Sequence, residues 1–282
     1  MTFNSLTRRG FLATAGTAWS IEYTVADRLP KDIDSLSKRA VDAEPDWAIV
    51  REAFSLPDGL VYMNNGSLGP CPGFVKWRAL NAWDRLERNP VREAFGPLQA
   101  AADEVRSKAA FFLHCSAEEI AITRNTTEAM NMVAQGARLR TGDRVLTTNH
   151  EHAGGIRCWE YFADEIGVVI DKVKLPVPPE SPEQVVRLFE EKIRRDTRVL
   201  SVSHVTSSTG LRMPVAALSE LARANDLLFV VDGAQAPGGM KVDLQRLQCD
   251  AYATSAHKWM LAPKGTGLLY IRKQSQKAIR PM

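Results

Sequence analysis

The amino-acid sequence predicts a doubly wound α/β fold built on a mostly parallel sheet. From residue 120 onward, short apolar runs alternate with segments of helical periodicity, which is the pattern of strands joined by crossover helices. One run, Leu227–Val231, is apolar at every position, as expected for a strand that is buried on both faces. Ligands bind beyond the carboxyl ends of the strands in such sheets, so the residues that follow each run are the candidate functional residues.

The elements are expected in the following order. Trp77, Leu80 and Trp83 recur at helical spacing and Asn89-Pro90 stops the pattern, which predicts a helix over 74–88. A strand over 60–63, closed by turn residues, precedes this helix, and a second helix is expected over 97–113. Beyond them we expect strands at 120–123, 144–147, 168–173, 198–205, 227–231 and 268–271, and helices at 126–138, 154–165, 182–195 and 214–225.

The composition is that of an ordinary globular protein of 282 residues, with 45% hydrophobic and 24% charged residues. The 36 basic and 33 acidic residues leave a net charge of +3 and are spread along the chain, so no nucleic-acid partner is expected. No run reaches the roughly 18 apolar residues of a membrane-spanning helix. The four cysteines are far apart and lack a CxxC pattern, so no disulfide framework is expected.

The first 26 residues resemble a twin-arginine export signal. Arg8 and Arg9 precede a Phe-Leu pair and a weakly apolar stretch that ends near Trp19, and small residues up to Ala26 suit a cleavage site. The sequence therefore predicts a signal peptide over 1–26, an arm over 27–59 and a large domain over 60–282, in a periplasmic protein. Alternatively, the two arginines belong to an ordinary tail and the protein is cytoplasmic.

Polar residues follow three of the predicted strands. Thr126 and Thr127 open the helix after 120–123, where N–H groups and hydroxyls suit a phosphate, although N-capping alone also explains them. His152 comes after the strand expected at 144–147. It is either an ordinary loop histidine or a ring that stacks on an aromatic ligand. No metal is expected, because no further ligands stand at metal spacing. Asp232 ends the apolar strand, where a carboxylate is costly unless it caps a helix or pairs with a cation.

A fourth polar cluster, Ser255-Ala256-His257-Lys258, follows later in the chain. A lone lysine is most often a surface residue, but polar clusters at several predicted strand ends favour a shared site. Asp232-Gly233-Ala234-Gln235-Ala236 and Ser255-Ala256-His257-Lys258, in this order and spacing, resemble the class V aminotransferase family. This resemblance covers about residues 60–280. It implies the large domain of a fold-type I enzyme, with pyridoxal 5'-phosphate (PLP) as the cofactor.

The same resemblance implies a role for each motif residue. Lys258 would carry the cofactor as a Schiff base and move protons at the substrate Cα. Asp232 would pair with the pyridine nitrogen and keep the ring an electron sink, and His152 would stack on the ring. Gln235 would donate to the phenolic oxygen of the cofactor. The phosphate would be bound by Thr126, Thr127, Ser255 and His257.

Two segments favour the branch of isopenicillin N epimerase-like proteins. Tyr62–Pro70 resembles their opening motif, and Ser207 stands where desulfurases tend to have asparagine. The expected function is PLP-dependent chemistry on an amino acid or related amine, by racemisation, elimination or transamination. The alternative is a cysteine desulfurase, although no cysteine lies where the desulfurase nucleophile would be.

Members of this family usually continue into a smaller C-terminal domain that binds the substrate carboxylate. The resemblance implies that this domain is largely absent from the 282 residues. A third hypothesis is therefore a non-catalytic remnant of the fold, which binds PLP or nothing. The resemblance also implies a homodimer, with no membrane partner beyond the export signal.

Overall fold

The computed structural model describes residues 47–280, and the chain divides into two units, Met1–Ser55 and Leu56–Met282. In the first unit it describes the short helix α3 (Trp47–Glu52). The predicted signal peptide at 1–26 and most of the predicted arm at 27–59 lie outside the described residues. The second unit holds the sheet and the candidate site.

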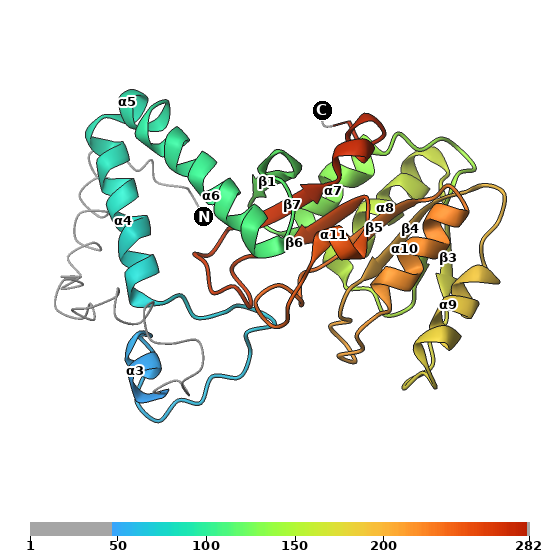
Figure 1. Cartoon of the computed structure of the whole chain (residues 1–282), viewed down its shortest axis with the longest axis horizontal. Helices are drawn as coiled ribbons and strands as arrows, with labels where there is room; N and C mark the ends of the chain where they lie inside the picture. The colour runs from blue at the N-terminus through green and yellow to red at the C-terminus, as the bar shows by residue number, and fades with distance from the viewer. Residues whose placement is uncertain (1–46, 281–282) are drawn as a thin grey trace, which may run out of the picture. The chain divides into compact units, whose positions relative to one another are not determined.

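The second unit is built on a seven-stranded sheet with the order β1-β7-β6-β5-β4-β2-β3 (Figure 1). Strands β2 to β6 are parallel to their neighbours in this group, and β7 runs antiparallel to both β6 and β1. The strands are β1 (Ile120–Thr123), β2 (Arg144–Thr148), β3 (Val169–Val173), β4 (Thr197–Ser203), β5 (Leu228–Asp232), β6 (Ala251–Thr254) and β7 (Gly267–Ile271).

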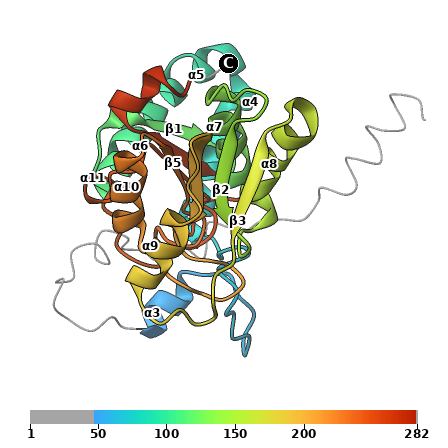
Figure 2. The same cartoon turned by 90° about the vertical axis from the view of Figure 1, so that its right-hand side faces the viewer.

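Helices cover both faces of the sheet (Figure 2). One face packs against α6, α9, α10 and α11, and the other packs against α7 and α8. The helices of this unit are α4 (Gly73–Arg88), α5 (Pro90–Ala94), α6 (Pro97–Leu113), α7 (Thr126–Gly136), α8 (Ala153–Ile166), α9 (Pro182–Glu190), α10 (Val215–Ala224) and α11 (Leu244–Leu247), with the 3-10 turns η2 (Ala117–Glu119) and η3 (Lys273–Lys277). The doubly wound, mostly parallel fold expected from the sequence is therefore confirmed.

The two cores follow from the alternation of side chains along the strands. In β5, Phe229 and Val231 belong to the core under α10, whereas Val230 between them belongs to the core under α7 and α8. All three are at most 1% exposed, because both faces of this central strand are covered. An unbroken apolar run is the sequence that such a strand requires.

Three expectations differ from the structure. The strand expected over 60–63 is wrong, because this segment pairs with no other strand and leaves Val61 and Met63 more than three-quarters exposed. The helix expected over 182–195 ends at Glu190. Strand β6 and helices α5 and α11 were not expected. The short apolar run over 60–63 fits strand periodicity, but a strand also needs a neighbour with free backbone groups.

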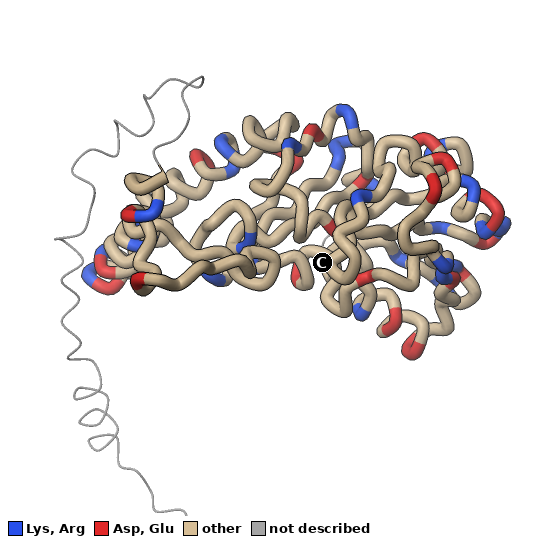
Figure 3. The backbone as a smooth tube through the Cα atoms, turned by 90° about the horizontal axis from the view of Figure 1, so that it is seen from below, with Lys and Arg blue, Asp and Glu red and all other residues tan. Residues whose placement is uncertain are grey.

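Charged residues of both signs are interspersed along the described chain (Figure 3). Among residues 47–280, no helix is long and apolar enough to cross a membrane. In the same residues, no three His, Cys, Asp or Glu side chains gather in a way that would hold a metal ion.

Candidate active site

A cavity of about 840 Å³ lies among the segments that follow β1, β2, β4, β5 and β6. Its volume is within the range of ordinary small-molecule sites. The structure brings together in its lining all eight residues that the sequence singles out, namely Thr126, Thr127, His152, Asp232, Gln235, Ser255, His257 and Lys258. Because the connections after five separate strands contribute, four of them leading to helices and one to β7, only the folded sheet creates this site.

Asp232 is the last residue of β5 and is 5% exposed. Its Oδ1 accepts a hydrogen bond of 2.9 Å from the backbone N–H of Ala234. Burial raises the pKa of this carboxyl, while that hydrogen bond and the charges of Lys258 and His152 act in the opposite direction. A buried carboxylate in this setting is suited to a cationic ligand atom.

Lys258 lies in the loop after β6. It ends a turn that begins at Ser255, and its backbone N–H donates to Ser255 O at 3.3 Å. Burial lowers the pKa of the Lys258 amine, and the charge of Asp232 partly offsets this effect. A lysine with a lowered pKa holds more of the neutral, nucleophilic amine. Lys258 is thus partly buried within the cavity lining, unlike a typical surface lysine.

The wall between β2 and α8 combines a histidine with two glycines. His152 caps α8, since its Nδ1 accepts from the N–H of Gly154 at 3.0 Å, which leaves the ring proton on Nε2. A Cβ on Gly154 would lie 2.6 Å from Thr127 Oγ1, and a Cβ on Gly155 would lie 2.5 Å from Asp232 Oδ2. The glycines therefore let this wall approach the polar side chains that line the cavity.

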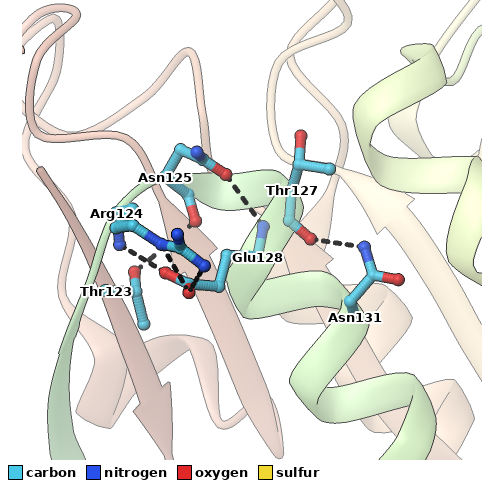
Figure 4. Close-up of polar contacts among 6 residues, drawn as sticks. All are labelled: Thr123, Arg124, Asn125, Thr127, Glu128 and Asn131. Carbon is cyan, nitrogen blue, oxygen red and sulfur yellow. Dashed lines mark hydrogen bonds and ion pairs between the residues drawn. The ribbon is translucent and has the colours of Figure 1, made fainter. Parts of the chain in front are cut away.

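The N-terminus of α7 forms another part of the lining. Thr126 Oγ1 lies 2.8 Å from Ser255 Oγ, which also accepts from the N–H of Thr126 at 3.0 Å. Asn125 caps the helix by accepting from the N–H of Glu128 at 2.8 Å (Figure 4). Thr127 stands apart from the Arg124–Glu128 pair in the same view. First-turn N–H groups, hydroxyls and the helix dipole together suit a phosphate.

His257 lies beside this helix end in the cavity lining. Its Nδ1 is 2.9 Å from the carbonyl oxygen of Thr266, which can only accept, so Nδ1 carries a proton. The imidazole is thereby held in one orientation, with Nε2 as its second polar atom. The family resemblance assigns this residue to the phosphate, which remains a prediction.

Gln235 bridges two segments of the cavity wall. Its Nε2 donates to Gly66 O at 3.0 Å, and its Oε1 accepts from Trp259 Nε1 at 2.7 Å. A backbone hydrogen bond of 2.9 Å from Gly69 N to His257 O holds the same segment against the Lys258 loop. Met63, Asn64, Gly66 and Ser67 of this segment line the cavity, whereas sequence reasoning used the segment only to choose a branch of the family.

Glu151, which precedes His152 in the chain, is a buried carboxyl that sequence reasoning did not single out. Its Oε2 accepts from the N–H and the hydroxyl of Ser203 at 2.8 and 2.6 Å, and its Oε1 accepts from Thr148 Oγ1 at 2.6 Å. Burial and, to a smaller extent, the negative charge of Asp232 raise the pKa of Glu151 to about 7. The hydrogen bonds from Ser203 and Thr148 lower the pKa but do not outweigh burial. The carboxyl ties the ends of β2 and β4 together next to His152.

A second such group lies beneath the site. His204 Nδ1 is 2.9 Å from Tyr252 Oη, and both side chains are at most 2% exposed. Burial, and then the charge of Arg212, lower the pKa of His204 to about 4, so the imidazole is neutral at ordinary pH. The backbone N–H of His204 donates to Asp232 O at 2.8 Å, which holds β4 against β5 at the strand end.

These residues fit PLP as a bound group. PLP presents an aromatic ring with a basic nitrogen, a phenolic oxygen, a phosphate and an aldehyde that condenses with an amine. The cavity offers a buried carboxylate at Asp232, an amide at Gln235, hydroxyls beside a helix N-terminus and a lysine whose pKa is lowered. The fold and this set of groups together define the large domain of a fold-type I PLP protein.

Comparison with known proteins agrees with that class. The family model described as "Aminotransferase class-V" matches residues 84–282. The chain belongs to the class V aminotransferase family.

Three similar proteins illustrate the family. Isopenicillin N epimerase of Amycolatopsis lactamdurans is 38% identical over 245 residues, which cover 83% of this chain and 60% of the epimerase. The cysteine desulfurase CsdA of Escherichia coli superposes with a TM-score of 0.73 at 29% identity, over 85% of this chain and 61% of CsdA. A lysine variant of C-DES, with glycine covalently linked to its PLP cofactor, gives a TM-score of 0.75 at 25% identity, over 85% of this chain and 62% of C-DES.

The family match and a similar structure with PLP bound confirm the cofactor expected from the sequence. Epimerase and desulfurase relatives both occur, as the motifs predicted. The chain spans about 60% of the length of the curated relatives it matches. The roles of individual site residues stay predictions.

Proposed function

We propose that this chain provides the cofactor-binding domain of a PLP-dependent enzyme that acts on an amino acid or related amine through Lys258. The observation that carries the proposal is the position of Lys258, with its lowered pKa, in one cavity with the buried Asp232. Burial disfavours the carboxylate of Asp232 and the ammonium of Lys258. A bound ring with a protonated nitrogen would offset this cost at Asp232, because it would supply the carboxylate with a positive partner.

The chemistry that PLP supplies when bound is the delocalisation of negative charge from the substrate Cα into its ring. The contribution of Asp232 is to hold a proton on the ring nitrogen by its negative charge. Lys258, once free, takes the proton from Cα and returns it. The α7 N-terminus, with Thr126 and Ser255, anchors the phosphate.

Among the family's reactions we favour epimerase-like chemistry. The support is the 38% identity to isopenicillin N epimerase and the position of Ser207 and of the segment 64–67 in the cavity lining. Cysteine desulfurase activity is the second candidate, since a cysteine desulfurase is 32% identical. Of the four cysteines, none lines the cavity in the described part of the chain. A non-catalytic remnant is the third.

The first experiment establishes the cofactor and the central residue. Purified protein is mixed with PLP, its visible spectrum is recorded before and after borohydride, and the reduced adduct is mapped by mass spectrometry. We expect an absorbance band that borohydride abolishes, with the adduct on Lys258. A folded protein that gives no band, or an adduct elsewhere, would contradict the proposal and favour the remnant.

The second experiment separates the candidate reactions. The PLP-loaded protein is incubated with single amino acids in D2O, and the Cα proton is followed by NMR while sulfide is measured with cysteine. Exchange at Cα that depends on Lys258 and occurs without sulfide release supports the epimerase-like reaction, whereas sulfide release from cysteine supports the desulfurase. Neither signal from protein with bound PLP supports the remnant.

We also propose that the chain is exported through the twin-arginine route and forms a homodimer. The support for export is the Arg8-Arg9 pair followed by a short apolar stretch. Cell fractionation of the wild type and of the double variant Arg8→Lys, Arg9→Lys tests export, and equal periplasmic amounts would refute it. Analytical ultracentrifugation tests the dimer, and a monomer at micromolar concentration would refute it.

A further inference from the structure

Gln235 has its side-chain amide fixed in one orientation by two partners of opposite kind. The indole N–H of Trp259 is a donor and cannot accept, so the atom that faces it at 2.7 Å must be Oε1. The carbonyl of Gly66 accepts and cannot donate, so the atom that faces it at 3.0 Å must be Nε2. Both partners independently require the same orientation.

This orientation has a consequence for the cavity that Gln235 lines. A primary amide nitrogen carries two N–H groups, and Gly66 takes one of them. The second belongs to the same nitrogen and remains for a ligand. If the amide were reversed, its oxygen would face Gly66 O and any anionic ligand oxygen, and its NH2 group would face the Trp259 N–H. The two observed hydrogen bonds, and the one available to a ligand, would then be replaced by repulsive contacts.

Trp259 itself is placed by its surroundings. It follows Lys258 directly, is partly buried and lines the cavity. A Cβ on Gly238 would lie 2.5 Å from the backbone C and O of Trp259, so the chain at 238 lies directly against it. Gly66 also packs here, since a Cβ on it would lie 3.7 Å from the Trp259 ring. The indole is therefore held where its N–H meets Gln235.

We propose that Trp259 is a positioning residue, which orients the amide of Gln235 so that it presents an N–H, and not an oxygen, to the phenolic oxygen of the bound cofactor. This inference rests on the proposed function, because it assumes that PLP occupies the cavity. It adds to that function a residue which acts through Gln235 rather than on the substrate.

The test is a pH titration of the visible absorbance of PLP-loaded protein. The titration follows the bound cofactor between two forms that differ by one proton. An N–H donor to the phenolic oxygen stabilises the form with more negative charge, so loss of that donor moves the midpoint of the titration to higher pH. For Trp259→Phe, which keeps an aromatic ring but no donor, we expect a rise of about one pH unit, a tenfold change in the protonation equilibrium. Gln235→Ala should give a similar rise, and the double variant should give no further rise.

Trp83→Phe is the matched control, because Trp83 is 68% exposed on α4 and does not line the cavity. Its midpoint should equal that of the wild type. A wild-type midpoint in Trp259→Phe, or additive shifts in the double variant, would overturn the inference while leaving PLP binding intact. Failure of the wild type to bind PLP would instead overturn the proposed function, so the two failures are distinguishable.

A second measurement applies where Trp259→Phe does not fold. Protein labelled with 15N-tryptophan gives indole N–H signals for the six tryptophans. In Gln235→Ala, the Trp259 signal should move upfield and exchange with solvent faster, because its acceptor is lost. An unchanged Trp259 signal would show that the contact does not hold in solution and would overturn the inference.

Discussion

The substitution Gly155→Ala tests the close approach of α8 to the carboxylate of Asp232. A Cβ at position 155 would lie 2.5 Å from Asp232 Oδ2, which is about 1 Å short of an ordinary non-bonded contact of about 3.5 Å. The carboxylate cannot simply rotate away, because its other oxygen accepts from Ala234 N at 2.9 Å. We therefore expect Asp232 to be displaced from its place in the cavity.

The expected magnitudes differ for folding and for cofactor binding. Overpacking costs about 1–3 kcal/mol, while alanine in place of a helical glycine returns about 0.5–1 kcal/mol, so the free energy of unfolding should fall by about 0–2.5 kcal/mol. A misplaced Asp232 loses a charge-assisted interaction worth about 1.5–3 kcal/mol, which lowers PLP affinity by about 10- to 100-fold. Cofactor binding should therefore be affected more than stability.

The assay is a PLP titration followed by tryptophan fluorescence, with urea unfolding of the same samples. Gly239→Ala is the control, because a Cβ there would meet its nearest atom, in the Trp259 ring, at an ordinary 3.5 Å. This control should bind PLP and unfold like the wild type. If Gly155→Ala binds PLP within twofold of the wild type, the reasoning from close approach is refuted.

Three further predictions follow from the site. Lys258→Ala should fold with an unchanged urea midpoint but give no absorbance band that borohydride abolishes; a retained band would place the linkage elsewhere. Ser255→Ala removes the partner of both the N–H and the hydroxyl of Thr126, and should lower PLP affinity by about tenfold without abolishing the link to Lys258, as a PLP titration would show. Glu151→Gln tests the raised pKa of about 7. A carboxyl whose pKa is higher in the folded than in the unfolded protein stabilises the fold while it is protonated. This stability is fully present below the ordinary pKa of a glutamate and is lost as the pH rises through 7. In urea, this variant should match the wild type at pH 4 and exceed it at pH 8 by up to about 3 kcal/mol, because the glutamine amide stays neutral and can donate to Thr148. Equal stability at both pH values would contradict the raised pKa.

Six of the seven strands of the sheet, and the polar residues that end three of them, could be predicted from the sequence. The run before Asp232 is apolar at every position because both faces of β5 are covered, and such a run is visible without coordinates. The parallel arrangement then places the ends of several strands at one edge, so Asp232 could be assigned to that edge in advance. Lys258 follows β6, which was not predicted, and only its motif assigned it to the same site. The family motif added the expected role of each residue.

The contacts between distant segments could only be found in the tertiary structure. Gly66 and Gln235 are 169 positions apart and Glu151 and Ser203 are 52 apart, and no local pattern marks either pair. The strand expected over 60–63 failed for the same reason, because periodicity is a property of neighbouring residues, whereas a strand needs a partner from elsewhere in the chain. The sequence by itself determined which groups end the strands. The folded chain alone determined how Trp259 orients Gln235, because a hydrogen bond depends on where two side chains meet in space.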